Sequence, residues 1–497
     1  MNSVNDTLPP VHRLSIESLE FIFLLLSQPV TNMVTAHVCQ YWRQITLGSP
    51  RICARICVNG YLTDGSSHLA RAALARSNPI PVHIHIASRR LVTSAEEVLL
   101  WDDVLRQSVR WEQAQLSLPL VVAMKVTELN APLLRALDIG VMPREPCLDS
   151  EQSGEADTED DSDEEDIIGP EFFIKAPLLT HATIAGTLCP LQIALPYAQL
   201  LNLSLQLGAY DDSLRDLIDV LTPCTLLAHL TVSMTACSGT DTVPFTLPAL
   251  QVLDVNNQAT ELCRDLIAPS LLQIVFRMEH IDVQDPERYL NKELLSLLRL
   301  ARRCGDKITS LTLRVGIFES DESCDILDRV LRALPGVTEL ETWEYLGQAN
   351  VYEYSLIIDG ALHQLYDPNA PFLPNLTKLS MHTWHSDWIR RDMDDIRAMV
   401  ESRRRDGVLG RATLQYLELD QQTDLWSDDD WQYEFSSLEE CERTYVEDHA
   451  DAFEWMVIMR KAGLDIQSNW LDKFLAFKLQ PRVPGPRKPK FDITIGR

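Results

Sequence analysis

The chain has 497 residues, of which 45% are hydrophobic and 23% are charged, and its formal net charge at pH 7 is −28. This length is too great for one compact core and predicts several domains or an elongated array. A chain so acidic repels nucleic-acid phosphates, which argues against a broad role in binding DNA or RNA.

No segment of the sequence is typical of a membrane or secreted protein. The longest apolar run, Phe21–Leu26, is far shorter than the about 20 residues of a membrane span. The N-terminus lacks the basic and apolar stretches of a signal peptide. The 11 cysteines include no C-x-x-C pair, which favours free buried thiols over disulfides or zinc. We therefore expect a cytoplasmic and/or nuclear protein without membrane contact.

The first 58 residues predict a small helical unit. Ser15 can cap a first helix, whose apolar face carries Ile16, Leu19, Ile22, Phe23 and Leu26. A second helix is predicted from Thr31 or Asn32 to Gly48, with an apolar stripe at Val34, Val38, Tyr41, Trp42 and Ile45. A bundle of about 50 residues buries little surface on its own, so these stripes indicate a protein partner.

The segments "PPVHRLSIESLEFIFLLL" and "VCQYWRQITLGSPRICARICV" carry a family resemblance. Together they resemble an F-box, in the form common in mushroom-type fungi, over residues 9–58. The resemblance implies a three-helix unit that binds the Skp adaptor of an SCF-type cullin-RING ubiquitin ligase and, through it, the ligase core. The adaptor-binding residues that it implies are Leu14, Ile16, Glu17, Leu19, Ile22, Phe23, Val38, Cys39, Trp42, Ile45 and Pro50. For Trp42, core packing is favoured over direct adaptor contact.

Two positions depart from the family's usual pattern. The family has Leu-Pro-Pro where this chain has Leu14-Ser15-Ile16, and a proline in the first helical turn preorganises φ. The family's Trp is replaced by Cys53, which removes a large buried aromatic ring. These departures support an alternative, a repeat scaffold whose degenerate F-box-like unit no longer binds the adaptor.

Residues 59–148 are predicted to hold the first strand and helix repeat units. Within them, His83 and His85 lie on one face of a predicted strand, a geometry that can hold zinc. Val82, Ile84 and Ile86 alternate with them, so a half-buried strand with outward histidines is favoured. Because no third ligand and no catalytic motif is found along the chain, we expect no metal, no cofactor and no enzymatic activity.

Residues 149–169 are predicted to be a disordered acidic insertion. The run 149–166 holds 11 acidic residues and no basic one, and no aliphatic residue larger than Ala156. Thr158 and Ser162 each precede an acid by three residues, a context that acidophilic kinases prefer. A solvated run of charge is the favoured interpretation.

A repeated pattern, apolar-x-x-apolar-x-apolar, indicates a stack of short strands. It occurs at Leu134/Leu137/Ile139, Leu179/Ala182/Ile184, Leu200/Leu203/Leu205, Leu227/Leu230/Val232, Leu250/Leu253/Val255, Leu271/Ile274/Phe276, Ile308/Leu311/Leu313, Val337/Leu340/Thr342, Leu376/Leu379/Met381 and Leu414/Leu417/Leu419. One such strand cannot bury its own face, but a stack builds a continuous core. Some intervening segments read as helices, such as Trp388–Arg405. The spacing resembles irregular leucine-rich repeats, so we predict an α/β fold (α+β overall) in which residues 170–478 form a leucine-rich-repeat-like solenoid.

The C-terminal part of that region is acidic and aromatic. Residues 424–454 hold 12 acidic residues against Arg443 alone. The candidate residues for a substrate-binding rim are Trp426, Trp431, Tyr433, Phe435 and Trp455. Packing as a cap on the last repeat is favoured over a surface for a basic segment of a protein substrate. The tail at 479–497 is rich in Pro and basic residues and is predicted to be disordered.

Two functions follow as expectations from the sequence. The first is the substrate-recognition subunit of an SCF-type ubiquitin ligase, which binds the Skp adaptor through the F-box and a protein substrate through the repeats. The second is the repeat scaffold without adaptor binding. The substrate itself is not identified by any motif.

Overall fold

The computed structural model describes two compact units, Met1–Ile308 and Thr309–Arg497, and each is considered by itself. The described residues are 14–26, 31–60, 63–88, 94–142, 172–186, 193–207, 214–235, 243–278, 286–316, 321–345, 372–383, 388–404, 412–421, 443–444, 446–447 and 449–479. The acidic run 149–166 and the tail beyond Leu479 therefore lie outside the described residues, and so do Thr158 and Ser162.

The N-terminal helical unit contains α1 (Ile16–Leu26), α2 (Thr31–Val38), α3 (Gln40–Gly48) and the short α4 (Pro50–Cys53). The prediction of a single second helix is wrong, because the helix is interrupted at Cys39 and divides into α2 and α3. There the backbone is extended (φ −158°, ψ 169°), and the Cys39 Sγ accepts a hydrogen bond from the Trp42 amide at 3.4 Å. Cys39 thus acts as the N-cap that starts a new helix.

The last residues assigned to the helical unit belong to a strand instead. Ser49 caps α4 by accepting a hydrogen bond from the Ile52 amide at 3.3 Å, and Pro50 occupies the first helical position. After α4 the chain enters β1 (Arg55–Gly60), which pairs in parallel with β2 (Val82–Ser88). The helical unit is therefore joined to the sheet without a linker.

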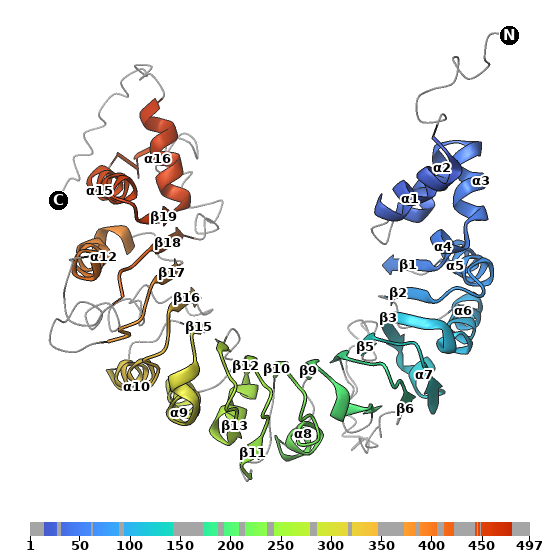
Figure 1. Cartoon of the computed structure of the whole chain (residues 1–497), viewed down its shortest axis with the longest axis horizontal. Coiled ribbons are helices and arrows are strands. Elements are labelled where there is room, and N and C mark those ends of the chain that lie inside the picture. Colours follow the sequence, from blue (N-terminus) through green and yellow to red (C-terminus); the bar gives the residue numbers. More distant parts are fainter. Residues whose placement is uncertain are drawn as a thin grey trace, which may run out of the picture. The chain divides into compact units, whose positions relative to one another are not determined.

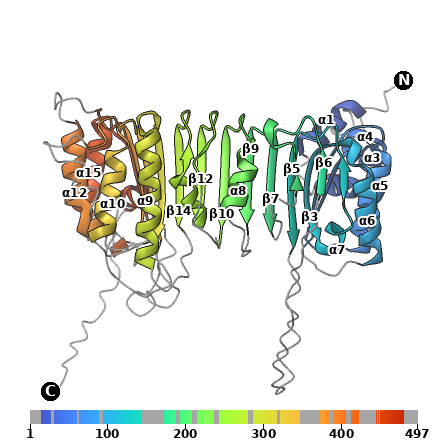
Figure 2. The ribbon, with the colours of Figure 1, turned by 90° about the horizontal axis from the view of Figure 1, so that it is seen from below.

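A parallel sheet forms the main layer of the first unit (Figure 1). After β1 and β2 its strands are, in order, β3 (Trp111–Pro119), β5 (Ala136–Met142), β7 (His181–Gly186), β9 (Asn202–Leu207), β10 (His229–Met234), β12 (Val252–Asn257) and β14 (Gln273–Met278). The helices α5 (Asp64–Arg76), α6 (Ala95–Arg106), α8 (Leu214–Leu221) and α9 (Pro286–Cys304) lie on one side of this layer (Figures 1 and 2). The other side is open.

Smaller elements complete the first unit. The short strands β4 (Glu128–Asn130), β6 (Phe172–Lys175) and β8 (Ile193–Ala194) form one small sheet, and β11 (Phe245–Thr246) and β13 (Leu266–Ile267) form another. The helix α7 (Leu120–Ala123) follows β3. The 3₁₀ turns are Ser108–Arg110, Tyr197–Gln199, Gln258–Arg264 and Gly305–Lys307.

The second unit repeats the same plan. Its parallel strands are β15 (Ser310–Gly316), β16 (Glu339–Tyr345), β17 (Lys378–Thr383), β18 (Tyr416–Gln421) and β19 (Asp465–Gln467). Its helices are α10 (Asp321–Arg332), α12 (Trp388–Arg404), α15 (Ala450–Lys461) and α16 (Asn469–Leu479). The predicted helix at Trp388–Arg405 is confirmed within one residue by α12.

The repeated pattern marks the core of both units. All ten copies fall on or next to strands, and every residue that defines them is at most 4% exposed. The parallel sheet confirms a mixed α/β fold with one strand per repeat. Burial of each such Leu or Ile stabilises the fold by about 1.5–3 kcal/mol relative to exposure. No helix in the described part of the chain is long and apolar enough to cross a membrane.

Candidate functional site

The helical unit has a small apolar core of its own. Its buried centre consists of Leu19, Phe23, Ile45 and Ile52. The Trp42 ring packs against this core, with its centroid 4.8 Å from that of Phe23 at an interplanar angle of 55°. The core-packing interpretation of Trp42 agrees with this position.

The stripe predicted to contact an adaptor is divided between inside and outside. Leu19 and Phe23 are at most 1% exposed and Ile45 is 6% exposed, so none of the three is available to a partner. Leu14 and Ile16 are exposed, and Ile22 is partly buried. The sequence pattern identified one apolar face of α1, but it did not reveal that this face packs inward as the core of the unit itself.

The exposed side of α1 carries two large apolar residues that the sequence pattern did not single out. Phe21 is 62% exposed and Leu25 is 69% exposed. At about 100° per residue, these two residues share a stripe on the side of α1 opposite Leu19 and Phe23. We call Phe21 and Leu25 the outer stripe of α1. Val38, which is 57% exposed, is a further apolar side chain open to solvent on this unit.

Polar contacts hold α1 in place. The Ser15 Oγ accepts a hydrogen bond from the Ser18 amide at 3.2 Å, so the helix has a side-chain cap where the family has prolines. At the opposite end, Arg55 Nη1 on β1 donates to the Leu24 carbonyl at 3.0 Å, and Ser49 Oγ donates to the Glu20 carboxylate. The outer stripe is therefore presented by a fixed helix.

The remaining predicted adaptor residues have mixed positions. Glu17 is exposed in the first turn of α1, where a backbone N–H and the Ser15 hydroxyl lower the pKa of its carboxyl. Pro50 is exposed, while Cys39 is half-buried at its capping position. Cys53 is 7% exposed and lines a cavity of about 120 Å³ between α4, β1 and α5. The cysteine, which is smaller than the family's Trp, thus borders space that its side chain does not fill.

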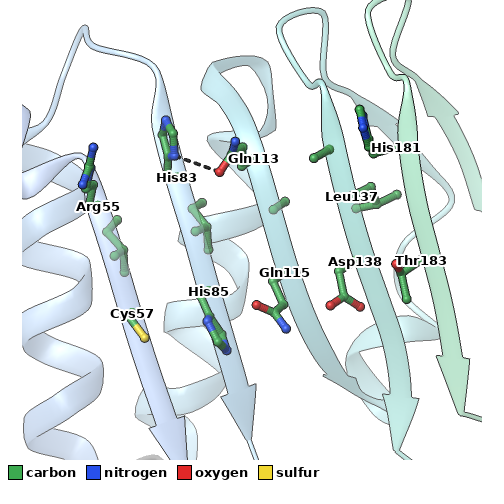
Figure 3. A pocket seen from close by; sticks show the side chains of 14 residues that line it. Arg55, Cys57, His83, His85, Gln113, Gln115, Leu137, Asp138, His181 and Thr183 are labelled. Atoms are coloured by element: carbon green, nitrogen blue, oxygen red, sulfur yellow. Dashed lines mark hydrogen bonds between the residues drawn. The ribbon is translucent and has the colours of Figure 1, made fainter. Parts of the chain in front are cut away.

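A second feature lies on the open side of β1, β2, β3, β5 and β7. It is a polar hollow with a volume of about 570 Å³ (Figure 3). The register of the strands brings together a first row, Arg55, His83, Gln113, Ala136 and His181, and a second row, Cys57, His85, Gln115, Asp138 and Thr183. Long side chains surround short ones such as Ala136, which leaves the depression.

The positions of the side chains on β2 confirm the prediction of a half-buried strand with outward histidines. Val82, Ile84 and Ile86 are at most 3% exposed, while His83 and His85 turn toward the hollow (Figure 3). A ring nitrogen of His83 lies 3.1 Å from Gln113 Oε1, and the other lies 3.3 Å from Glu112 Oε2. His83 is thus engaged with protein groups.

The second row contains two partly buried ionisable side chains, His85 and Asp138, whose pKa values shift in opposite directions. Burial lowers the pKa of His85 and raises the pKa of Asp138, since both lose hydration on the sheet surface. Arg55, Asp138 and His181 were not singled out from sequence, because only the strand register places them beside the β2 histidines. Among the described residues, no group of three His, Cys, Asp or Glu side chains could hold a metal ion.

The predicted rim is described only in part. Trp426, Trp431, Tyr433 and Phe435 lie outside the described residues. Trp455, on α15, is half-buried, and the Arg397 guanidinium of α12 lies 5.8 Å from its ring centroid. Its neighbours along the helix, Phe453 and Met456, are fully buried. The described end of this region therefore packs on the unit as a cap would.

No protein-family model matches the chain, and no curated protein matches it.

Proposed function

We propose that the chain is the substrate-recognition subunit of an SCF-type cullin-RING ubiquitin ligase. In this proposal α1 to α4 act as an F-box that binds the Skp adaptor. The parallel strands and their helices act as an irregular leucine-rich-repeat-like solenoid that holds a protein substrate. The chain contributes binding and not chemistry.

One observation carries the proposal. Helix α1 is apolar on two opposite sides, of which one is the core of the helical unit and the other is exposed. A surface helix normally turns one apolar face to the core and polar residues to solvent. When a partner covers exposed Phe and Leu side chains on a fixed helix, the buried apolar surface stabilises the complex by about 25 cal/mol per Å².

The scaffold alternative has an observation in its favour. Leu19, Phe23 and Ile45, which the family resemblance assigned to the adaptor, are internal to this unit. The cavity beside Cys53 also leaves the unit less well packed than a Trp would. In the scaffold, the outer stripe of α1 would serve a partner other than the adaptor.

The deciding experiment is co-purification of the full chain with a Skp adaptor. The test variant is Phe21→Glu/Leu25→Glu, which changes only exposed positions of α1. The control is Leu99→Glu/Ile458→Glu, which adds the same charge at exposed apolar positions of α6 and α15. We expect the test variant to lose the adaptor by at least about tenfold and the control to retain it.

Two results would count against the ligase role. If the wild-type chain does not bind the adaptor, the scaffold alternative is preferred. If the test variant binds as well as the control, the adaptor contact does not involve the outer stripe. Variants of Leu19 or Phe23 do not serve here, because they damage the core of the unit itself.

A further inference from the structure

The open side of β15 to β19 in the second unit carries a ladder of polar and aromatic side chains. The register aligns Thr312, Glu341, Ser380 and Glu418 in one row and Arg314, Trp343, His382 and Asp420 in the next. Glu339, Lys378, Tyr416 and Asp465 form a third row. We call these three rows the acidic ladder.

Two carboxylates of the ladder are fixed by neutral donors. Thr312 Oγ1 donates to Glu341 at 3.2 Å, and Trp343 Nε1 donates to the same carboxylate. Ser380 Oγ and Tyr416 Oη donate to Glu418 Oε2 at 2.9 and 3.1 Å. Burial, followed by the nearby Glu418, raises the pKa of Tyr416 to about 12, so this donor keeps its proton. These bonds orient Glu341 and Glu418 without cancelling their charge.

The cations on this side do not balance the carboxylates. Glu339, Glu341, Glu418, Asp420 and Asp465 share the ladder with Arg314 and Lys378 among its described side chains. Both cations are also close to aromatic rings: the Arg314 guanidinium lies 4.6 Å from the Trp343 centroid and Lys378 Nζ lies 5.1 Å from that of Tyr416. The ladder keeps an excess of negative charge.

His382 is a buried side chain of the ladder with a ring nitrogen left unsatisfied by the described residues. Its side chain is 8% exposed, and its ring stacks on Trp343 at 3.8 Å between centroids. Nε2 lies 4.0 Å from Glu341 Oε1 and Nδ1 lies 3.8 Å from Asp420 Oδ2. Nδ1 makes no hydrogen bond to any described residue. In either neutral tautomer, one ring nitrogen is an acceptor that faces a carboxylate oxygen, and an added N–H donor would satisfy both.

The donor is best supplied by a basic peptide side chain. Glu341 and Glu418 lie on β16 and β18, two strand spacings apart, which is about 10 Å. A peptide extended in the polyproline II conformation covers that distance in three residues at about 3.1 Å each, and with three residues per turn its residues i and i+3 face the same side. A divalent cation is disfavoured because no three-ligand group exists among the described residues. A nucleic acid is repelled by the carboxylates.

We propose that the acidic ladder binds an extended peptide segment with Lys or Arg at every third position, through Glu341, Glu418 and Asp420. As a statement about the substrate, this rests on the proposed ligase function. Peptide binding itself is measured without the adaptor, so each proposal can fail while the other holds.

The test is fluorescence anisotropy of a labelled Lys-Gly-Ser-Lys-Gly-Ser-Lys peptide titrated with the purified full chain. The test variant, Glu341→Gln/Glu418→Gln/Asp420→Asn, removes three charges from the ladder. The control, Glu322→Gln/Asp325→Asn/Asp394→Asn, removes three charges from exposed positions of α10 and α12. Both keep the acidic run 149–166 and have the same net charge, so general attraction of the basic peptide is equal in both.

We expect the test variant to bind the peptide about tenfold more weakly than the control, and the control to match the wild type. A peptide with Glu in place of each Lys should not bind. Equal affinities of the two triple variants would overturn the proposal, and so would equal binding of the Glu peptide. Circular dichroism and thermal unfolding of both variants confirm that each is folded.

Discussion

The helical unit α1 to α4 and the parallel sheet that follows it use apolar residues in opposite ways. In the sheet, each strand alternates between a buried apolar side chain and an open side that carries polar groups, as His83, Ile84 and His85 do on β2. In α1, apolar side chains occupy both sides, and only Leu19 and Phe23 are in the core. The strands thus expose polar side chains on their open side, whereas α1 exposes the apolar side chains of Phe21 and Leu25, which a partner could bury.

The largest expected effect comes from one substitution made on each side of α1. Phe23→Ala should destabilise the helical unit by about 3–5 kcal/mol, because it opens a cavity in the core. Phe21→Ala, two residues earlier, should change the stability by no more than about 0.5 kcal/mol, because that ring is 62% exposed. Hydrogen exchange of the α1 to α4 amides, measured by mass spectrometry, reports both values. Similar losses in the two variants would mean that α1 has no free side.

The next effect concerns the buried side of the first unit, where the ionisable residue Glu293 lies among apolar side chains. Glu293, on α9, is fully buried, and burial raises the pKa of its carboxyl to about 8. Thr260 Oγ1 is within hydrogen-bonding distance of both the Glu293 carboxyl group and the Asn257 carbonyl, the latter at 2.7 Å. The single hydroxyl proton can serve only one of these acceptors, unless Glu293 is protonated and itself donates to the hydroxyl. Protonation thus gives both hydroxyl protons an acceptor.

Its consequence is a pH-dependent stability. The folded pKa of Glu293 lies above its unfolded value, so the folded state binds more protons between the two values and loses stability as pH rises through them. From pH 6 to pH 9 the free energy of unfolding should fall by about 2–3 kcal/mol from this group. Urea unfolding across that range measures the fall, and Glu293→Gln should remove most of it. A slope that is unchanged in the variant would assign the dependence to other groups.

The same contrast explains which parts of the molecule could be predicted. The ten strand positions follow from spacing, because a repeated Leu-x-x-Leu-x-Leu has only one face that can be buried. The strand β3 has the same spacing, with Trp111, Ala114 and Leu116 buried, and was missed because a Trp replaces the first aliphatic residue. The apolar face of α1 with Leu19 and Phe23 was predicted, but the sequence could not show that this face forms the core of the unit itself while Phe21 and Leu25 stay exposed on the other side.

The open-side features needed the register as well as the strands. Glu341, Ser380 and Glu418 are neighbours in the acidic ladder, although 39 and 38 residues separate them along the chain. Insertions of different length between repeats conceal that alignment. The polar hollow is similar, since β1 was placed in the helical unit and Arg55 was therefore not associated with His83.

A smaller effect concerns a single ring on the open side of the second unit. His382→Phe keeps an aromatic ring to stack on Trp343 but removes both ring nitrogens. If the imidazole accepts a hydrogen bond from the basic peptide, its loss should weaken binding about threefold. The anisotropy titration described for the acidic ladder measures this change. Wild-type affinity in this variant would exclude the imidazole from the contact and leave the carboxylates alone.

The smallest effect tests the break between α2 and α3, which the sequence pattern did not predict. Cys39 is the N-cap of α3, and its sulfur is a weak acceptor for the Trp42 amide at 3.4 Å. Serine is a stronger capping residue than alanine, so Cys39→Ser should be more stable than Cys39→Ala by about 0.5–1 kcal/mol. If α2 and α3 were one continuous helix, the order would reverse, because alanine is the better residue in a helix interior. Hydrogen exchange of the α2 and α3 amides in the two variants gives the sign. That sign decides whether Trp42 enters the core from a new helix that starts at Cys39 or from the second half of a long one.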